Sequence, residues 1–251
     1  MGEMKTQKAV YSWELPPEPI TDIAREVKTE LLIVGAGVAG VTTALSAAEE
    51  GVKVTVLSKA PVCIALGGSV FAFNSRLTKK FGIHYDLSEV MQRVMLLNNK
   101  RIDEQAWSIF LNRSGEVLDW AMDYGEAHGL TPVLQNCEPI TEYPIIGEYY
   151  GTHLFVGGKN GQDIAGNPQQ DLLEIMRDEA IARGTDFRFN ITAKQLIREE
   201  GGEGRVTGVI AQEKDGSYTR YLAENVVLAT GDYGRNLEMM EKFHPYLLPL
   251  A

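Results

Sequence analysis

Cysteine is scarce in this sequence, and its scarcity limits the chemistry that the chain can carry. Only Cys63 and Cys137 occur among 251 residues, far apart and without a CxxC pair or paired histidines. A disulfide framework or a structural zinc site needs several such residues at close spacing. We therefore predict no disulfide and no metal site, and an ordinary buried or half-buried thiol at each cysteine.

Long apolar runs are also lacking. No stretch approaches the roughly 20 apolar residues of a membrane helix, and residues 1–20 lack the apolar core of a secretory signal. Acidic residues outnumber basic ones by 34 to 24, for a formal net charge of −10, which disfavours binding to nucleic-acid phosphates. The composition predicts a cytoplasmic protein with a small-molecule substrate, no nucleic-acid partner and no membrane span.

What the sequence does contain is the periodicity of an α/β protein. An apolar run over 29–34, a helix from Val38 to Glu50 and a second apolar run over 52–58 predict two parallel strands joined by a helical crossover. Further helices are expected over 86–98, 103–128 and 167–184, with Asp86 or Ser88, Asp103 and Ser114 as candidate caps. Residues 129–168 have the composition of a loop.

The C-terminal part alternates apolar and polar residues. Between 191 and 224 turn signals at Gly201–Gly204 and Asp215-Gly216 separate three short runs, which predict a β-meander. The meander is expected to continue into a buried strand over 225–230. At the other end, residues 1–28 are polar and contain prolines, as in an extended lead-in segment, with Trp13 as a possible surface anchor.

Three glycines stand between the first strand and its helix. In the G-x-G-x-x-G spacing, Gly35 permits a tight turn, Gly37 lets a phosphate approach the backbone, and Gly40 lets the helix lie close to the strand. A pyrophosphate then binds at the helix N-terminus, where amide groups and the helix dipole favour anions. We predict a dinucleotide site formed by the residues of this turn: Gly35, Ala36, Gly37, Val38, Ala39 and Gly40.

The end of the second strand leaves the identity of the dinucleotide open. An acidic residue is usual there, where it accepts hydrogen bonds from a ribose, but this chain has Ser58 followed by Lys59. A serine hydroxyl also bonds to a ribose, whereas a Ser-Lys pair suits a 2′-phosphate. An NADP-dependent dehydrogenase therefore remains an alternative.

Four stretches together resemble the fumarate reductase and succinate dehydrogenase flavoprotein family. They are VGAGVAGVTTALSAAEEG with VTVLSK, IALGGSVFAFN, ITAKQLIREEGGEGRVTGVIA and VVLATGDYGRNLEMMEKFHP. The resemblance implies FAD, with Gly67, Gly68 and Ser69 beside the flavin ring and the backbone near Ala193 at the adenine. It also implies that Ala229, Thr230 and Gly231 form a turn at the cofactor, although Asp232 stands where the family has a glycine.

The resemblance further implies a doubly wound, Rossmann-like α/β FAD-binding domain with an inserted three-stranded β-meander. Residues 1–28 would be an N-terminal extension and 29–251 an incomplete FAD-binding domain, with a helical and loop insertion at about 75–165. The capping domain and the closing segment of the family would lie outside this sequence. Because some members attach FAD through a histidine before the Gly-Gly segment and this chain has none there, the FAD is expected to be non-covalent.

The function implied by the resemblance is that of a flavin-dependent oxidoreductase. Such an enzyme moves a hydride between reduced FAD and the activated C=C bond of a small acid, enoate or ketosteroid-like molecule. The arginine that protonates the substrate comes from later parts of the family fold, so the catalytic residues remain unknown. A non-catalytic FAD-binding fragment or subunit, completed by a partner chain, is a further alternative. His153 is expected to be a surface residue, with an acid or anion contact as the alternative, and Arg235 faces either the solvent or a carboxylate. Tyr143, Tyr149 and Tyr150 form either a self-packed loop or a lining beside the flavin.

Overall fold

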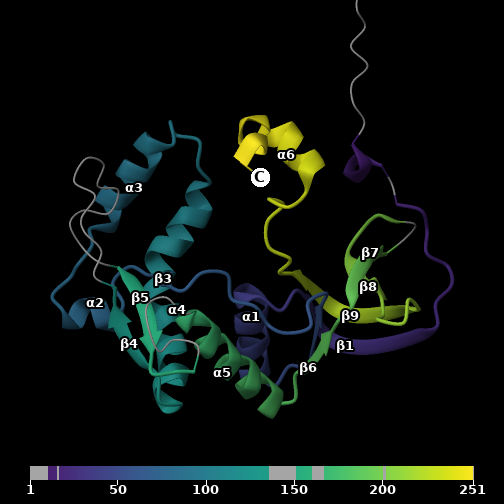
Figure 1. The fold of residues 1–251 in the computed structure, drawn as a ribbon, viewed down its shortest axis with the longest axis horizontal. Coiled ribbons are helices and arrows are strands. Elements are labelled where there is room, and N and C mark those ends of the chain that lie inside the picture. Colours follow the sequence, from purple (N-terminus) through teal and green to yellow (C-terminus); the bar gives the residue numbers. More distant parts are fainter. Residues whose placement is uncertain (1–10, 16, 136–150, 160–166, 200–201, 251) are drawn as a thin grey trace, which may run out of the picture. The chain divides into compact units, whose positions relative to one another are not determined.

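The structure is a computed structural model that describes residues 11–15, 17–135, 151–159, 167–199 and 202–250 (Figure 1). Cys137 and the three loop tyrosines of the sequence analysis lie outside these residues. The chain forms two compact units. We call them the sheet unit, made of Met1–Gly40, Val52–Val62 and Asp186–Ala251, and the helical unit, made of Val41–Gly51 and Cys63–Thr185.

A six-stranded sheet of order β6-β2-β1-β9-β8-β7 forms the sheet unit. Strand β1 pairs in parallel with β2 and β9, and β2 with β6, whereas β7, β8 and β9 form the antiparallel meander. Helix α1 (Val38–Glu49) connects β1 to β2, as predicted. The strands are β1 (Arg25–Val34), β2 (Val54–Ser58), β6 (Asp186–Phe189), β7 (Thr192–Arg198), β8 (Val206–Gln212) and β9 (Tyr218–Leu228).

Strand β9 belongs to both parts of this sheet. Its first residues pair with β8 and its whole length pairs with β1. Strand β1 begins at Arg25, ahead of the apolar run predicted from position 29, because the first residues of β1 pair with the first residues of β9. The strand predicted over 225–230 is present to Leu228 as the end of β9. Its predicted burial is wrong, since Asn225 is exposed and the Leu228 side chain is 57% exposed.

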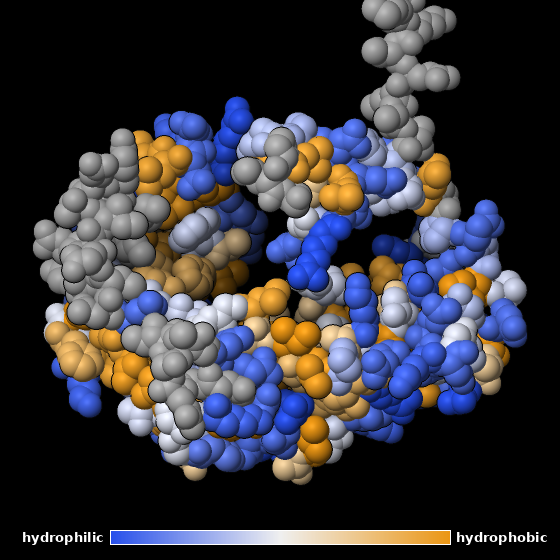
Figure 2. Space-filling model, in the orientation of Figure 1, coloured by the Kyte–Doolittle hydropathy of each residue, from blue (hydrophilic) through white to orange (hydrophobic). Residues whose placement is uncertain are grey.

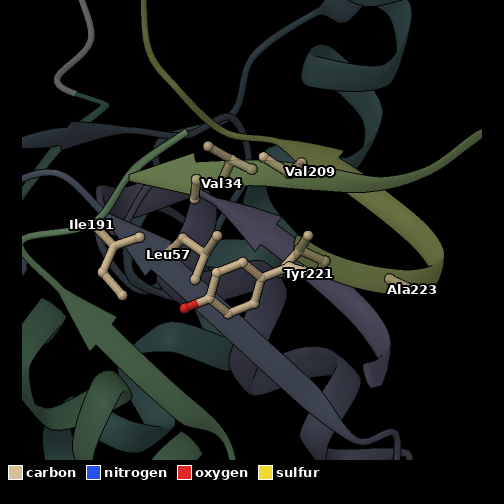
Figure 3. Packing of buried hydrophobic residues seen from close by; sticks show 8 residues of the cluster. Val34, Leu57, Ile191, Val209, Tyr221 and Ala223 are labelled. Carbon is tan, nitrogen blue, oxygen red and sulfur yellow. The ribbon is translucent and has the colours of Figure 1, made fainter. Parts of the chain in front are cut away.

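One hydrophobic cluster of the sheet unit lies on one face of the sheet. Figure 3 shows the Tyr221 ring beside Leu57, with Val34 and Val209 close to each other and Ile191 on the other side of Leu57. These side chains come from β1, β2, β8, β9 and the start of β7. Side chains of alternate residues point to the same face of a strand, so the period-two pattern of the sequence places them together.

In its described residues, the helical unit contains helices α2 to α5 and a small antiparallel sheet of order β3-β5-β4. Asp86 and Asp103 cap α3 and α4 as predicted, but Ser114 is not a cap. It lies inside α4, where its hydroxyl accepts a hydrogen bond from the Phe73 N–H at 3.0 Å. The elements are β3 (Val70–Phe71), α2 (Arg76–Lys80), α3 (Leu87–Leu97), α4 (Glu104–Ala127), β4 (Thr131–Leu134), β5 (Thr152–Val156) and α5 (Pro168–Ala182).

Strands β4 and β5 correct the prediction of a loop over 129–168. They pair antiparallel from Thr131 with Val156 to Leu134 with His153, and Leu154 and Phe155 are buried. Pro132 disfavours a strand in the sequence because proline lacks an N–H for the hydrogen-bond ladder. Strand β4 is at the edge of its sheet, where a proline is tolerated.

The N-terminal lead-in packs on a C-terminal helix within the sheet unit. The short η1 (Ser12–Glu14) lies against α6 (Leu237–Phe243), which η3 (Pro245–Leu250) follows. The Trp13 ring is 5.8 Å from that of Phe243, and the Lys242 ammonium is 4.6 Å from the Trp13 ring centre. The prediction of an anchor at Trp13 is confirmed.

The surface is mixed rather than uniformly polar. On the face drawn in Figure 2, apolar patches interrupt the hydrophilic atoms, and the exposed apolar side chains include Leu66, Leu228, Leu237 and Tyr246. None of the helices in the described residues has both the length and the apolar character of a membrane span. The same residues contain no group of three or more His, Cys, Asp or Glu side chains placed to hold a metal ion.

Candidate cofactor-binding site

The turn after β1 brings together residues that are far apart in the sequence. The Gly35 N–H donates to the Leu57 carbonyl at 2.7 Å, and the Ala229 N–H donates to the Val34 carbonyl at 2.8 Å. The carboxyl ends of β2, β1 and β9 therefore meet here. Ligands of open α/β sheets bind at this edge, so the structure joins two segments, Gly35–Gly40 and Ala229–Gly231, that the sequence analysis had assigned separately.

Only glycine fits at position 35. Its φ is +112°, a conformation that side chains rarely adopt, and a Cβ atom would lie 2.2 Å from the Ala229 carbonyl oxygen. Gly40 is required for a different reason, since its Cβ would lie 1.9 Å from the Gly35 carbonyl oxygen. The two glycines hold the start of α1 and the end of β9 close to the turn, in agreement with the roles predicted for them.

The start of α1 has the electrostatics of an anion site. The helix begins at Val38, directly after Gly37, and no acidic residue occupies its first turn. Helix N-termini attract negative charge through their amide groups and dipole. Ala36 is buried, Gly37 is half-buried, and Val38 and Ala39 are exposed. This arrangement fits the diphosphate of a dinucleotide, as the glycine spacing predicts.

Ser58 ends β2 beside this turn. Its side chain is 6% exposed and its carbonyl accepts the Ile191 N–H at 2.9 Å, whereas Lys59 is exposed. The register of β1 and β2 pairs Val34 with Leu57, which places Ser58 level with Gly35. The position is thus the one expected to face the ribose of a bound nucleotide.

Ala193 lies at an irregularity of the meander. It pairs with Ala211, but the register between β7 and β8 shifts between Ala193 and Gln195. A β-bulge of this kind interrupts the ladder and is common next to binding sites. Contact between this backbone and an adenine ring stays a prediction.

The turn after β9 is open. Thr230 and Gly231 are exposed, and Gly231 has a φ of +80°. Asp232, which replaces a glycine of the family pattern, accepts a hydrogen bond from the Gly234 N–H at 2.8 Å through its carboxylate. An Asx turn of this type reproduces a tight turn without a glycine.

Gly67, Gly68 and Ser69 belong to the helical unit. Gly67 has a φ of +93° and no atom within 4 Å of where a Cβ would be, and the preceding Leu66 is 84% exposed. Glycine is therefore required at Gly67 for its backbone conformation and not for packing. The predicted contact of this segment with a flavin ring stays a prediction.

The residues that fix the start of this segment by hydrogen bonds were not predicted from the sequence. The side chains of Asn167 and Gln170, at the start of α5, bond to the backbone of Cys63 and Ala65. Their partners lie 105 or so positions away in the sequence. No local pattern in the sequence indicates contacts at that separation.

The prediction of a surface position for His153 is wrong. The residue is fully buried on β5, its Nδ1 lies 2.8 Å from the Gly151 carbonyl oxygen, and its Nε2 lies 2.7 Å from the Ser75 hydroxyl. Burial lowers the pKa of His153, so the ring is neutral: Nδ1–H donates to the carbonyl and Nε2 accepts from the hydroxyl. The pair resembles a serine–histidine dyad, but Ser75 is also fully buried, which keeps it from substrate.

Other predicted positions agree with the structure. Arg235 is exposed. Cys63 is a buried free thiol, and burial raises its pKa to about 11, so it is protonated and unreactive near neutral pH.

Comparison with known proteins supports the cofactor that the turn suggests. A model of the FAD binding domain family matches residues 30–249. The chain belongs to this family. Among curated relatives, a vinyl phenol reductase of Lactiplantibacillus plantarum is 27% identical over 241 residues, which are 91% of this chain and 44% of the reductase. A fumarate reductase (cytochrome) of Shewanella frigidimarina is 24% identical over 227 residues, 87% of this chain and 36% of that protein.

Solved structures have the same fold. An open conformation of a flavocytochrome c3 fumarate reductase superimposes with a TM-score of 0.70 at 24% identity, covering 89% of this chain and 37% of that one. A 3-ketosteroid-Δ4-(5α)-dehydrogenase from Rhodococcus jostii reaches 0.71 at 21% identity, over 91% and 50%. The resemblance to fumarate reductase flavoproteins is confirmed, as are the fold class and FAD as the cofactor. The chain spans half or less of the length of each of these four proteins.

Proposed function

We propose that this chain is the FAD-binding part of a flavin-dependent oxidoreductase that reduces, or forms, an activated C=C bond. The observation that carries the proposal is the packing of Gly35 and Gly40 between β1, α1 and Ala229, which shapes a turn for a diphosphate. A small acid, an enoate or a ketosteroid-like molecule is the proposed substrate class. It is supported by relatives that are named for fumarate, vinyl phenol and ketosteroids.

The residues of this chain have distinct proposed roles. The turn Gly35–Gly40 binds the diphosphate, and Ser58 and Lys59 bind the ribose. The backbone near Ala193 binds the adenine. Residues Ala229–Gly231, next to the turn, also contact the cofactor. Gly67, Gly68 and Ser69 approach the flavin ring. When bound, FAD supplies the hydride transfer itself. No residue of this chain is proposed as the proton donor, and no histidine precedes Gly67 within 60–66 to attach the cofactor covalently.

The binding role is tested by calorimetry with FAD on the wild-type chain and two variants of Gly37. Because Gly37 directly precedes α1, aspartate there is a favourable helix cap but places a negative charge at the diphosphate. Gly37→Asp should leave the unfolding free energy nearly unchanged and abolish the heat of FAD binding. Gly37→Asn, of the same size without the charge, should weaken FAD binding through its bulk but less than Gly37→Asp does. Absence of heat with FAD for the wild type contradicts the proposal.

The alternative of an NADP-dependent dehydrogenase, raised by Ser58 and Lys59 at the end of β2, is disfavoured by the match of the FAD binding domain family to residues 30–249. A non-catalytic FAD-binding subunit is a second candidate, because the chain covers only 44% of the vinyl phenol reductase. Copurification with a second polypeptide, and substrate reduction only when both are present, would support that role.

A further inference from the structure

We propose that Gln170 and Asn167 are positioning residues that fix the glycine loop, defined as residues 66–69, before the cofactor binds. Both residues lie at the start of α5. This helix and the glycine loop belong to the same helical unit. Gln170 makes two hydrogen bonds to the backbone ahead of the loop: its Oε1 accepts the Ala65 N–H at 2.9 Å and its Nε2 donates to the Cys63 carbonyl at 3.0 Å. An amide side chain that bonds to a backbone N–H and a backbone carbonyl imitates a neighbouring strand.

Asn167 completes the set. Its Nδ2 donates to the Ala65 carbonyl at 2.9 Å, so two side chains satisfy three backbone groups directly ahead of the loop. Cys63 is fully buried and Ala65 is 3% exposed. Among the residues that the structure describes, the buried Oδ1 of Asn167 has no hydrogen-bond partner.

The loop itself receives little support from packing. Leu66 is 84% exposed, and no atom lies within 4 Å of the position of a Gly67 Cβ. On its far side the loop ends at β3, where Val70 pairs with His153. The path of the loop is therefore set by its two ends, and Gln170 and Asn167 fix the first of them.

A charged pair keeps Gln170 in place. Its Nε2 also donates to Glu174 at 3.0 Å, and the Lys159 ammonium lies 2.5 Å from the other Glu174 oxygen. The hydrogen bond from Lys159 lowers the pKa of Glu174, together with the bond from Gln170. Glu174 thus remains an ionised acceptor for Gln170 at neutral pH.

This inference rests on the proposed function, in which Gly67 and Gly68 approach the flavin ring. A loop that already has its bound conformation loses less conformational entropy when a ligand binds. Removal of the Gln170 bonds should therefore weaken FAD binding about 10-fold, as expected for a loss of about 1.4 kcal/mol. It should also change the absorption spectrum and the reduction potential of the bound flavin, because the backbone beside the ring is less ordered.

The test compares Gln170→Leu and Asn167→Asp with wild type and with Gln105→Leu, an exposed position on α4. Asn167→Asp retains the size of the side chain but removes the Nδ2 donor to the Ala65 carbonyl, so it leaves no cavity of its own. Hydrogen exchange of residues 63–69 without FAD should rise about 10-fold in both variants, the size expected for a loss of about 1.4 kcal/mol, and not in the control. FAD affinity, flavin absorption and reduction potential should shift in parallel.

Each outcome has a definite meaning. Unchanged exchange in both variants, or faster exchange with unchanged FAD affinity, spectrum and potential, overturns the positioning role. Wild-type binding of FAD in the same experiment keeps the proposed function intact in that case. If the wild-type chain binds no FAD, the proposed function fails, and this inference fails with it.

Discussion

At Gly40 a single missing methyl group sets the distance between a helix and a strand. A Cβ there would lie 1.9 Å from the Gly35 carbonyl oxygen, and this neighbour is backbone, which cannot move aside alone. We expect Gly40→Ala to lower the unfolding free energy by about 1–3 kcal/mol, the usual cost of overpacking, and to weaken FAD binding. Denaturant unfolding and calorimetry measure the two effects.

Gly51→Asn is the control for this variant. Gly51 has a φ of +77° and open space around its Cβ position, and asparagine tolerates that conformation better than other residues. The control should bind FAD like the wild type. Equal losses in both variants would contradict a specific role for the close approach at Gly40.

His153 shows how burial of one residue affects the pH dependence of stability. Burial lowers its pKa below the ordinary value of 6.5. The unfolded chain therefore binds a proton more readily than the folded chain. The contribution of His153 is complete above about pH 6.5 and is lost as the pH falls toward the lowered pKa, with a slope of at most about 1.4 kcal/mol per pH unit.

The groups facing His153 do not compensate for this loss. They are the Ser75 hydroxyl, the backbone of Gly151 and Val70, and Asp119, whose charge raises the pKa less than burial lowers it. Urea unfolding from pH 7.5 to 5 should show a smaller decline for His153→Gln than for wild type. The exposed His84→Gln should behave like wild type; identical slopes for all three proteins would refute the assignment.

Among the elements, η1 and α6 depend on each other. Lys242 lies 4.6 Å from the Trp13 ring centre and 5.3 Å from that of Tyr11, and its ammonium is also paired with Glu14. Trp13→Ala removes the contacts of the Trp13 ring with Lys242 and Phe243. It should lower the opening free energy of α6 by about 1–2 kcal/mol, from the cation–π contribution and the apolar contact with Phe243.

Hydrogen exchange of residues 237–243 measures that opening. Leu15→Ala, a neighbouring exposed position, is the control and should leave the exchange unchanged. Unchanged exchange in Trp13→Ala would mean that α6 is held by its own contacts with η3.

The elements themselves were predictable to different degrees. The helices α3, α4 and α5 follow from the spacing of their apolar residues and from caps such as Asp86, which are local features. Strands β4 and β5 were not predictable, because each is short, Pro132 interrupts one of them, and their pairing joins segments separated by residues 135–151. A strand is stabilised by its partner, and the partner is not visible in the local sequence.

For the whole molecule, FAD should act as a stabilising ligand. A ligand that binds only the folded chain contributes about 2.7 kcal/mol at about 100 times its Kd, which corresponds to a rise in Tm of about 5–10 °C for a chain of this size. Thermal unfolding with FAD, NADPH or no ligand measures the effect. A rise with NADPH and none with FAD would favour the dehydrogenase alternative.

The sequence by itself determined the turn and its chemistry. The spacing of Gly35, Gly37 and Gly40 between two apolar runs is a local pattern. Residues without side chains are needed wherever a backbone approaches a diphosphate. Only the tertiary structure decided what lies against that turn. The contact of Gly35 with Ala229, the burial of His153 and the reach of Gln170 to Ala65 arise from packing between distant segments, and such contacts leave no periodic signal in the chain.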